Sequence, residues 1–238
     1  MEITKELWGK GLLLTIVVAL SLSGCGKINI DTAPVVDLDE MCLHFTALEN
    51  NSVILIVNHG GNKPDVKIKQ NGLWKKWDYS QILLSKGQSI YMKGDNPNGF
   101  STGRAKFSQI ATTGKISSGG NVLSLLYEND FNKRTTVPEY GLNNVFNCSY
   151  GLVSAPDLPA TTLVTGCYRE MFNGCASLKF IKMGAIDISA KNCLLNWTEG
   201  VASEGTFIKN EKAEWSIRGY DGIPFNWTVS EASEFFSN

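Results

Sequence analysis

The sequence has few of the residues and motifs on which most catalytic and nucleic-acid-binding sites depend. It holds 2 histidines in 238 residues, and neither His44 nor His59 stands in an H-E-x-x-H or other metal-binding spacing. G-x-S-x-G, P-loop and G-x-G-x-x-G motifs are also missing. The 22 Lys and Arg residues are balanced by 23 Asp and Glu, with no basic run, so the charge pattern of a nucleic-acid-binding protein is absent. We therefore expect no nucleic-acid partner, no metal or cofactor and no enzyme, although a carboxylate pair formed only in space stays open.

Long apolar runs and helix-forming stretches are scarce as well. The uncharged run at residues 11–22 is too short to cross a bilayer as a helix of the mature chain. Ala-rich and Glu/Lys-rich stretches are few, whereas Gly, Asn, Ser and Thr are plentiful. This balance favours short strands and many turns, and it predicts a mostly β protein.

The six cysteines form no C-x-x-C pair, so neither a zinc ribbon nor a redox motif is indicated. Four of them, Cys148, Cys167, Cys175 and Cys193, fall in one stretch that repeats itself. Stacked turns there would bring Cys167 beside Cys193, near enough for a disulfide. The alternative is that these cysteines are buried thiols that serve as small apolar side chains.

Residues 1–24 are typical of an export signal. Lys5 and Lys10 precede or border the uncharged run, which ends in Leu22-Ser23-Gly24-Cys25. That ending resembles the lipobox of bacterial lipoproteins, which implies cleavage before Cys25, lipidation of Cys25 and attachment to a membrane through its acyl chains. An ordinary secretory signal with a stray cysteine, or a membrane anchor helix, are the alternatives.

Residues 25–42 are expected to be a tether. The segment holds Pro34 and the acidic run Asp37-Leu38-Asp39-Glu40, and it has no helical or strand period. We interpret the acidic run as a solvated linker, because no other oxygen ligands stand nearby that would make it a metal site.

Residues 43–126 read as a string of short strands. The strand-like runs are residues 43–48, 52–57, 66–69, 73–77, 82–84, 90–92 and 105–110. Asn71-Gly72 separates two of them, and this pair is a strong signal for a hairpin with a type I′ turn, because both central residues need positive φ. Runs at this spacing predict an N-terminal antiparallel β-sandwich.

Four aromatic residues in this segment suggest a platform for sugar rings: Trp74, Trp77, Tyr79 and Tyr91. We take Trp74, Trp77 and Tyr91 as the candidate ligand-binding residues. The alternative is packing, because Trp74 and Trp77 are three apart in a strand and point to opposite faces, so that at least one belongs in the core.

The stretch from Leu142 to Asn196 contains the same pattern twice, offset by 26 residues. The matches are Leu142 with Tyr168, Val145-Phe146-Asn147 with Met171-Phe172-Asn173, Leu152 with Leu178, and Cys167 with Cys193. Cys148 and Cys175 lie one place out of phase, as if Gly174 had been added to the second copy. A period in the twenties with fixed apolar positions predicts a solenoid whose turns bury a shared core, here a two-repeat solenoid over residues 127–196.

The repeat resembles a known family. Phe172-Asn173-Gly174-Cys175-Ala176-Ser177-Leu178 looks like the F-x-G-C-x-S-L core of BspA-like leucine-rich repeats, and residues 152–163 resemble the strand and return of that repeat. Gly205-Thr206-Phe207-Ile208-Lys209 and the segment to Val229 resemble the closing segment of Bacteroides surface proteins of this family. The resemblance implies a short leucine-rich-repeat solenoid in a surface lipoprotein.

Two repeats are fewer than such a solenoid needs for stability, which is about three. We therefore expect the preceding β-domain and a C-terminal cap over residues 197–238 to cover the apolar ends, with Trp197, Trp215 and Trp227 as packing residues rather than ligand contacts.

Together these features predict a non-catalytic, lipid-anchored envelope protein. The resemblance implies adhesion to host matrix proteins or to other cells, and a location at the outer membrane of a Bacteroidetes cell. A surface glycan-binding accessory protein is the alternative, and a structural envelope protein without an outside ligand is the third. Gly26-Lys27 follow Cys25 directly, where family members at the outer face usually carry acids, so the face of the membrane stays open.

Overall fold

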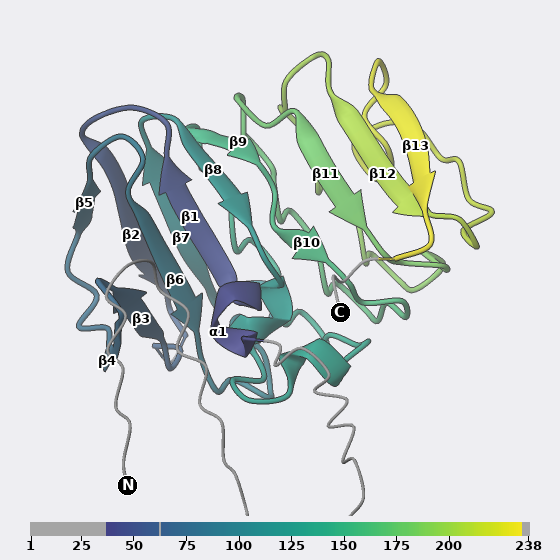
Figure 1. Cartoon of the computed structure of the whole chain (residues 1–238). Coiled ribbons are helices and arrows are strands. Elements are labelled where there is room, and N and C mark those ends of the chain that lie inside the picture. The colour runs from purple at the N-terminus through teal and green to yellow at the C-terminus, as the bar shows by residue number, and fades with distance from the viewer. Residues whose placement is uncertain (1–36, 62, 235–238) are drawn as a thin grey trace, which may run out of the picture. The chain divides into compact units, whose positions relative to one another are not determined.

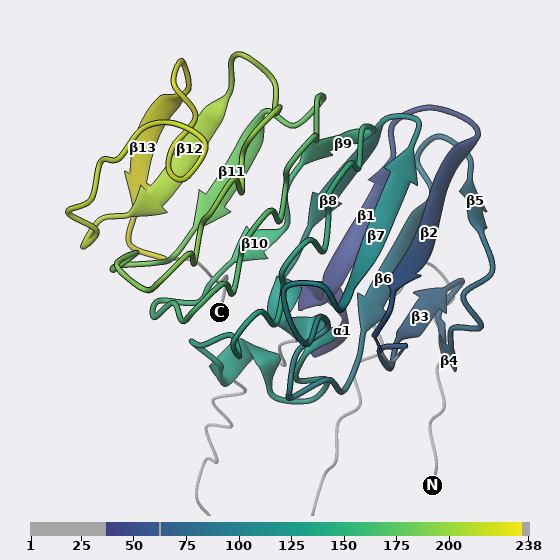
Figure 2. The ribbon, with the colours of Figure 1, turned by 180° about the vertical axis from the view of Figure 1, so that it is seen from behind.

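A computed structural model describes residues 37–61 and 63–234 of the chain, and these residues form one compact unit. The predicted signal peptide, Cys25 and residues 26–36 of the predicted tether lie outside the described residues. The described part is mostly β, as the composition predicts, and it includes a β-solenoid of about three turns. Figure 1 shows the strands and Figure 2 the same chain from behind.

The N-terminal strands form two sheets. They are β1 (Leu43–Ala47), β2 (Ser52–His59), β3 (Lys67–Gln70), β4 (Leu73–Lys76), β5 (Ile82–Leu84), β6 (Ser89–Lys93), β7 (Phe107–Thr113) and β8 (Ile116–Gly119). One sheet has the order β5-β2-β7, and the other the order β4-β3-β6-β1-β8-β9, where β9 is Leu152–Ser154. The strand predicted over residues 105–110 is β7, which begins two residues later than predicted, because residues 103 and 106 form a β-bridge in a turn before it.

The predicted hairpin is present. Asn71 and Gly72, with φ of 55° and 90°, connect β3 to β4, which pair antiparallel. Burial alternates along the strands: Leu43, Phe45 and Ala47 of β1 are buried, whereas the residues between them are partly exposed. This alternation fixes which side chains of the six-stranded sheet point outward.

The solenoid strands stack in parallel. They are β10 (Asp157–Leu158), β11 (Phe180–Met183), β12 (Thr206–Asn210) and β13 (Thr228–Ala232), which pair in this order. β9 precedes β10 along the chain and pairs with β8 of the six-stranded sheet. The predicted solenoid boundary at residue 196 is therefore too early, because β12 and β13 continue the same ladder inside the predicted cap. Sequence periodicity missed the later turn since its apolar positions are filled by different residue types.

Backbone conformation shows the period more clearly than the side chains do. Residues with positive φ recur in three columns with a spacing of 26: Tyr140, Gly166 and Asn192; Asn144, Glu170 and Asn196; Cys148, Gly174 and Gly200. Cys148 (φ 54°) thus occupies the place of Gly174 (φ 74°). The prediction that a glycine was added to the second copy is wrong: Cys148 stands in the first copy where the later copies have glycine.

The turns that carry these columns are joined by backbone hydrogen bonds. The amide of Leu142 donates to the carbonyl of Cys167 over 3.1 Å, and that of Tyr168 donates to Cys193 over 3.0 Å. Gly174 donates to Glu199 in the same way, over 2.7 Å. Each turn therefore satisfies its backbone groups on the next turn, which is the condition for burying a stacked core.

The N-terminal end of the solenoid is covered by the preceding sheets, whereas β13 at the other end is an edge strand with mostly exposed residues. Phe146 packs on Phe45 of β1, and the buried residues of the two parts form one continuous core, so the predicted domain boundary after residue 126 does not separate two cores. At the other end the indole nitrogens of Trp197, Trp215 and Trp227 donate to the carbonyls of Gly222, Ala185 and Ala202. These tryptophans are packing residues, as predicted.

The five described cysteines are free thiols, which agrees with the buried-thiol alternative. The thiol of Cys175 donates to the carbonyl of Phe146 over 2.9 Å, and that of Cys193 to Ile188 over 3.2 Å. Burial raises the pKa of Cys167 to about 12 and that of Cys193 to about 11, so both stay protonated near neutral pH.

Helical structure among the described residues is short. It consists of α1 (Leu38–Met41) and the 3₁₀ turns η1 (Val122–Leu125) and η2 (Phe131–Lys133). None of the described helices is long and apolar enough to span a membrane. The end of the predicted tether is thus ordered as α1, whose first amides are capped by the Asp37 side chain, which accepts from the amide of Asp39.

Hydrogen bonds join the six-stranded sheet to the solenoid sheet, which has the order β10-β11-β12-β13. β8 pairs with β9 in parallel, the amide of Asp157 donates to Gly120, and the amide of Ala155 donates to Phe180 of the next turn. The chain from β9 to β10 therefore lies between β8 and β11, as Figure 1 shows. A continuous face runs from β4 to β13; we call it the outer face.

Candidate binding site on the outer face

Side chains of the six-stranded sheet form two rows across the strands. The register pairs Lys76 with Lys67 and Lys67 with Lys93, which makes a lysine row over β4, β3 and β6. Two residues along, it pairs Trp74 with Lys69, Lys69 with Tyr91, Tyr91 with His44 and His44 with Gly119; we call this the aromatic row. Residues between the rows, such as Ile68 and Met92, are buried, so both rows lie on the outer face.

The lysine row places like charges directly opposite one another, which destabilises a sheet unless anions neutralise them. Glu128 does so from the loop after η1, 2.7 Å from the Lys67 ammonium and 3.7 Å from that of Lys93. Asp65 lies 3.5 Å from Lys76. The hydrogen bond to Glu128 raises the pKa of Lys67. The charges of the lysine row are therefore neutralised by acids that lie outside its strands.

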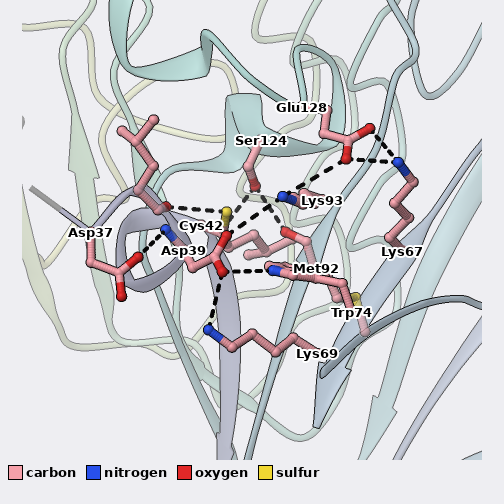
Figure 3. Close-up of polar contacts among 12 residues, drawn as sticks. Asp37, Asp39, Cys42, Lys67, Lys69, Trp74, Met92, Lys93, Ser124 and Glu128 are labelled. Atoms are coloured by element: carbon pink, nitrogen blue, oxygen red, sulfur yellow. Dashed lines mark hydrogen bonds and ion pairs between the residues drawn. The ribbon is translucent and has the colours of Figure 1, made fainter. Parts of the chain in front are cut away.

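Asp39 of α1 is the second acid at these rows (Figure 3). Its Oδ2 accepts from the Lys69 ammonium over 3.1 Å and from the Trp74 indole nitrogen over 2.8 Å, and its Oδ1 lies 3.5 Å from Lys93 Nζ. Burial acts to raise the pKa of Asp39, but the hydrogen bonds from Trp74 and Lys69 and the two lysine charges outweigh it, so this pKa lies below its usual value. The interpretation of the acidic run as a solvated linker is therefore wrong for Asp39.

Lysine ammonium groups lie against two rings of the aromatic row. The Lys93 ammonium lies 4.4 Å from the centroid of the Trp74 ring, and the Lys69 ammonium 5.9 Å from that of Tyr91. His44 packs beside Tyr91 with ring centroids 5.3 Å apart. The His44 ring also covers Gly119, where a Cβ atom would come within 2.7 Å of its Nε2. Glycine at this position lets the imidazole lie against the strand.

Of the three predicted ligand-binding residues, the structure brings two together. Trp74 and Tyr91 share the aromatic row. Trp77 follows β4, is 2% exposed and donates its indole N–H to the carbonyl of Ser80, and its ring stacks on Tyr79. Trp77 is therefore a core residue and not a surface contact, which is the packing alternative stated for it.

Sequence reasoning missed the charged members of the site, Asp39, Lys69, Lys93 and Glu128. The alternation in Val66-Lys67-Ile68-Lys69 shows that the lysines face away from the core. Nothing in the sequence shows that β6 pairs with β3, or that α1 folds back on both, because these are contacts between distant segments.

An open hollow of about 690 Å³ borders the lysine row. Glu128, Tyr127, Asp95 and Arg134 are among its lining residues. The Arg134 guanidinium pairs with Asp130 over 2.6 Å and lies 4.7 Å from the centroid of the Tyr127 ring. This charged recess is connected to the lysine row through Glu128.

The arrangement suits recognition by charge and by ring stacking. Among the described residues no group of three or more His, Cys, Asp or Glu is placed to hold a metal ion. Comparisons of this chain with protein-family models, with curated proteins and with solved structures find no match.

Proposed function

We propose that this chain is a non-catalytic, lipid-anchored protein of the cell envelope that binds a partner through its outer face. In this proposal the two N-terminal sheets are a β-sandwich and the solenoid is of the BspA-like leucine-rich-repeat class. The lipobox-like Leu22-Ser23-Gly24-Cys25 supports attachment to a membrane through Cys25, and the family resemblance supports an outer-membrane location.

The observation that carries the proposal is the continuity of the outer face from β4 to β13. A stable protein–protein contact needs about 800 Å² on each partner, and an extended sheet offers such an area without further loops. Solenoid strands add partly exposed residues to it, among them Phe180, Lys182 and Ile208. The partner class that the resemblance favours is a host matrix protein or a surface protein of another cell.

Binding of purified residues 36–238, whose described part forms a compact unit, to an array of host matrix proteins and glycans tests the proposal. Deleting the repeats would remove part of the shared core, so point variants are better. We expect a protein hit to be lost in the double variant Phe180→Ser, Ile208→Ser. The matched control is Tyr150→Ser, whose side chain is 61% exposed and lies outside the strands. A hit that both variants retain equally would contradict binding by this face.

Location needs a separate test. Protease treatment of intact cells should cleave the protein if it is displayed outward, and Cys25→Ser should release it from the membrane fraction. A protein that stays whole under the protease would rule out an exposed adhesin.

A second candidate function, glycan binding, is favoured by the aromatic row. Trp74 and Tyr91 lie beside lysine ammonium groups, and His44 packs beside Tyr91 on the same face. Aromatic rings pack well against the apolar faces of sugar rings. A glycan hit on the same array that Tyr91→Ser abolishes, and Tyr150→Ser does not, would favour this candidate. An array without any hit would favour the third possibility, a structural envelope protein.

A further inference from the structure

We propose that the lysine and aromatic rows form a binding site for an acidic saccharide, a sugar ring bearing a carboxylate, and that the Asp39 carboxylate occupies the anion position in this structure. The inference rests on glycan binding, the second candidate function above. It adds the charge class of the ligand and the identity of the group that competes with it.

The Asp39 carboxylate is held as a bound carboxylate ligand would be. One oxygen accepts from an ammonium and an indole N–H, and the other faces the Lys93 ammonium (Figure 3). Charge-assisted hydrogen bonds of this kind are among the strong polar contacts in proteins. The Asp39 side chain is 31% exposed, so solvent reaches the contact and a free carboxylate can compete for the same donors.

The backbone of the segment that supplies Asp39 is held at two carbonyl groups: Met41 accepts from the amide of Asn121 over 2.8 Å, and Leu38 accepts from the thiol of Cys42 over 3.4 Å. α1 is a single turn of four residues and none of them is buried; Leu38 and Met41 are only partly buried against the core. A helix this short has no stability of its own in water. Asp39 adds the ion pairs and the indole hydrogen bond to β3, β4 and β6, and its side chain can leave these donors while the backbone of α1 stays in place.

Displacement of the Asp39 carboxylate would leave Lys69 and Lys93, which lie diagonally on the neighbouring strands β3 and β6, without its charge. Glu128 would remain, paired with Lys67 at 2.7 Å and farther from Lys93 at 3.7 Å. Like charges so close favour any anion that takes the vacated position. The lysines therefore define an anion site whether or not the Asp39 carboxylate occupies it.

The rings decide in favour of a saccharide over an acidic peptide. Trp74 and Tyr91 flank Lys69 in the register, so an anion at Lys69 has an aromatic ring on either side. A pyranose ring attached to that anion can pack its C–H face on one of them. A flexible carboxylate side chain of a peptide would use the charge alone.

The test compares three variants of residues 36–238. Asp39→Ala removes the internal carboxylate, and Asp39→Asn removes its charge while keeping an acceptor for Trp74. Glu40→Ala is the matched control, because it removes the same charge from the same turn at an exposed side chain. The probes are a hexuronic acid oligosaccharide, a neutral hexose oligosaccharide of equal length and an oligoglutamate peptide, titrated calorimetrically at low ionic strength.

We expect Asp39→Ala and Asp39→Asn to bind the hexuronic acid oligosaccharide at least about tenfold more tightly than the wild type, a change of about 1.4 kcal/mol. Glu40→Ala should match the wild type. Adding Lys69→Gln to Asp39→Ala should abolish the gain, and salt should weaken it. Thermal unfolding confirms that each variant is folded, and Asp39→Asn serves if Asp39→Ala is not.

An equal affinity in Asp39→Asn and Glu40→Ala would overturn the competition by Asp39. An equal gain for the neutral oligosaccharide would overturn the anion site, and an equal gain for oligoglutamate would overturn the saccharide class. The two proposals fail in different ways: a matrix-protein hit on the array without any gain at Asp39 retains the adhesion proposal and sinks this one. If the wild type binds nothing on the array but the Asp39 variants bind the hexuronic acid oligosaccharide more tightly, the saccharide proposal is retained and the adhesion proposal fails.

Discussion

The ring of Phe172 stacks on that of Phe146, one solenoid turn earlier, with centroids 5.6 Å apart and planes inclined by 5°. Phe146 in turn contacts Phe45 of β1, and Phe172 contacts Trp197 of the next turn. This row of rings crosses from the N-terminal sheets into the solenoid without a break. The two parts therefore share one core and are expected to unfold together.

Phe172→Ala tests the shared core. The side chain is completely buried, so its loss should lower the free energy of unfolding by about 3–5 kcal/mol. Calorimetry should show one transition for the wild type and one, at lower temperature, for the variant. Two transitions, with a lower temperature in the variant only for the transition of the solenoid, would show that the solenoid and the N-terminal sheets unfold separately.

Cys148→Gly should stabilise the protein. A left-handed backbone at a residue with a Cβ atom costs about 1–2 kcal/mol, and glycine removes this cost. The greater freedom of glycine in the unfolded chain offsets about 0.5–1 kcal/mol of the gain. We expect a net gain of about 0.5–1 kcal/mol in denaturant unfolding.

The matched control for that variant is Gly174→Ala, which creates the same strain at the equivalent position and brings a Cβ atom within 3.2 Å of the Cys148 sulfur. It should destabilise the protein by about 1–2 kcal/mol. If both variants shift stability in the same direction, the equivalence of Cys148 and Gly174 does not hold.

The pH dependence of stability should carry the marks of two carboxylates with opposite shifts. The pKa of Asp39 is lowered, so its contribution is complete above its unfolded pKa and is lost as the pH falls through the folded pKa. Wild type and Asp39→Asn should therefore differ in stability at neutral pH and converge in acid.

Asp157 should behave in the opposite way. Burial raises its pKa, against the charges of Lys182 and His44, so the folded state favours the protonated carboxyl. Its stabilising contribution is present below the unfolded pKa and is lost as the pH rises through the folded pKa. Urea unfolding of Asp157→Asn across this range should show the wild type gaining on the variant in acid; a loss in acid would contradict the assigned direction.

Thiol labelling tests the state of the cysteines. Cys167 and Cys175 are completely buried and burial raises the pKa of both thiols, so native protein should resist alkylation at these residues. Cys148 is partly exposed and should react first. In urea without reductant, all repeat cysteines should become labelled. If Cys167 and Cys193 stay unlabelled until a reductant is added, the two form a disulfide.

The β class, the Asn71-Gly72 hairpin, the stacked turns and the packing role of the tryptophans follow from local pattern. The third turn does not. Trp197 stands at the position that Met171 holds one turn earlier, and a repeat cannot be recognised from residue type when the side chains at equivalent positions differ in shape. The candidate site is half predictable. Trp74 and Tyr91 stand out as aromatics in strands, but their relation to Asp39 depends on α1 folding back across the sheet.

Hydroxyl-radical footprinting of residues 36–238, free and bound to the ligand recovered from the array, tests binding by the outer face most directly. We predict that the bound protein loses reactivity at Trp74, Tyr91 or Phe180, which lie on that face. Tyr150, Tyr220 and Phe225, which are exposed outside the strands, should react unchanged. Protection of these three residues, with Trp74, Tyr91 and Phe180 unaffected, would place the binding surface elsewhere and contradict the account.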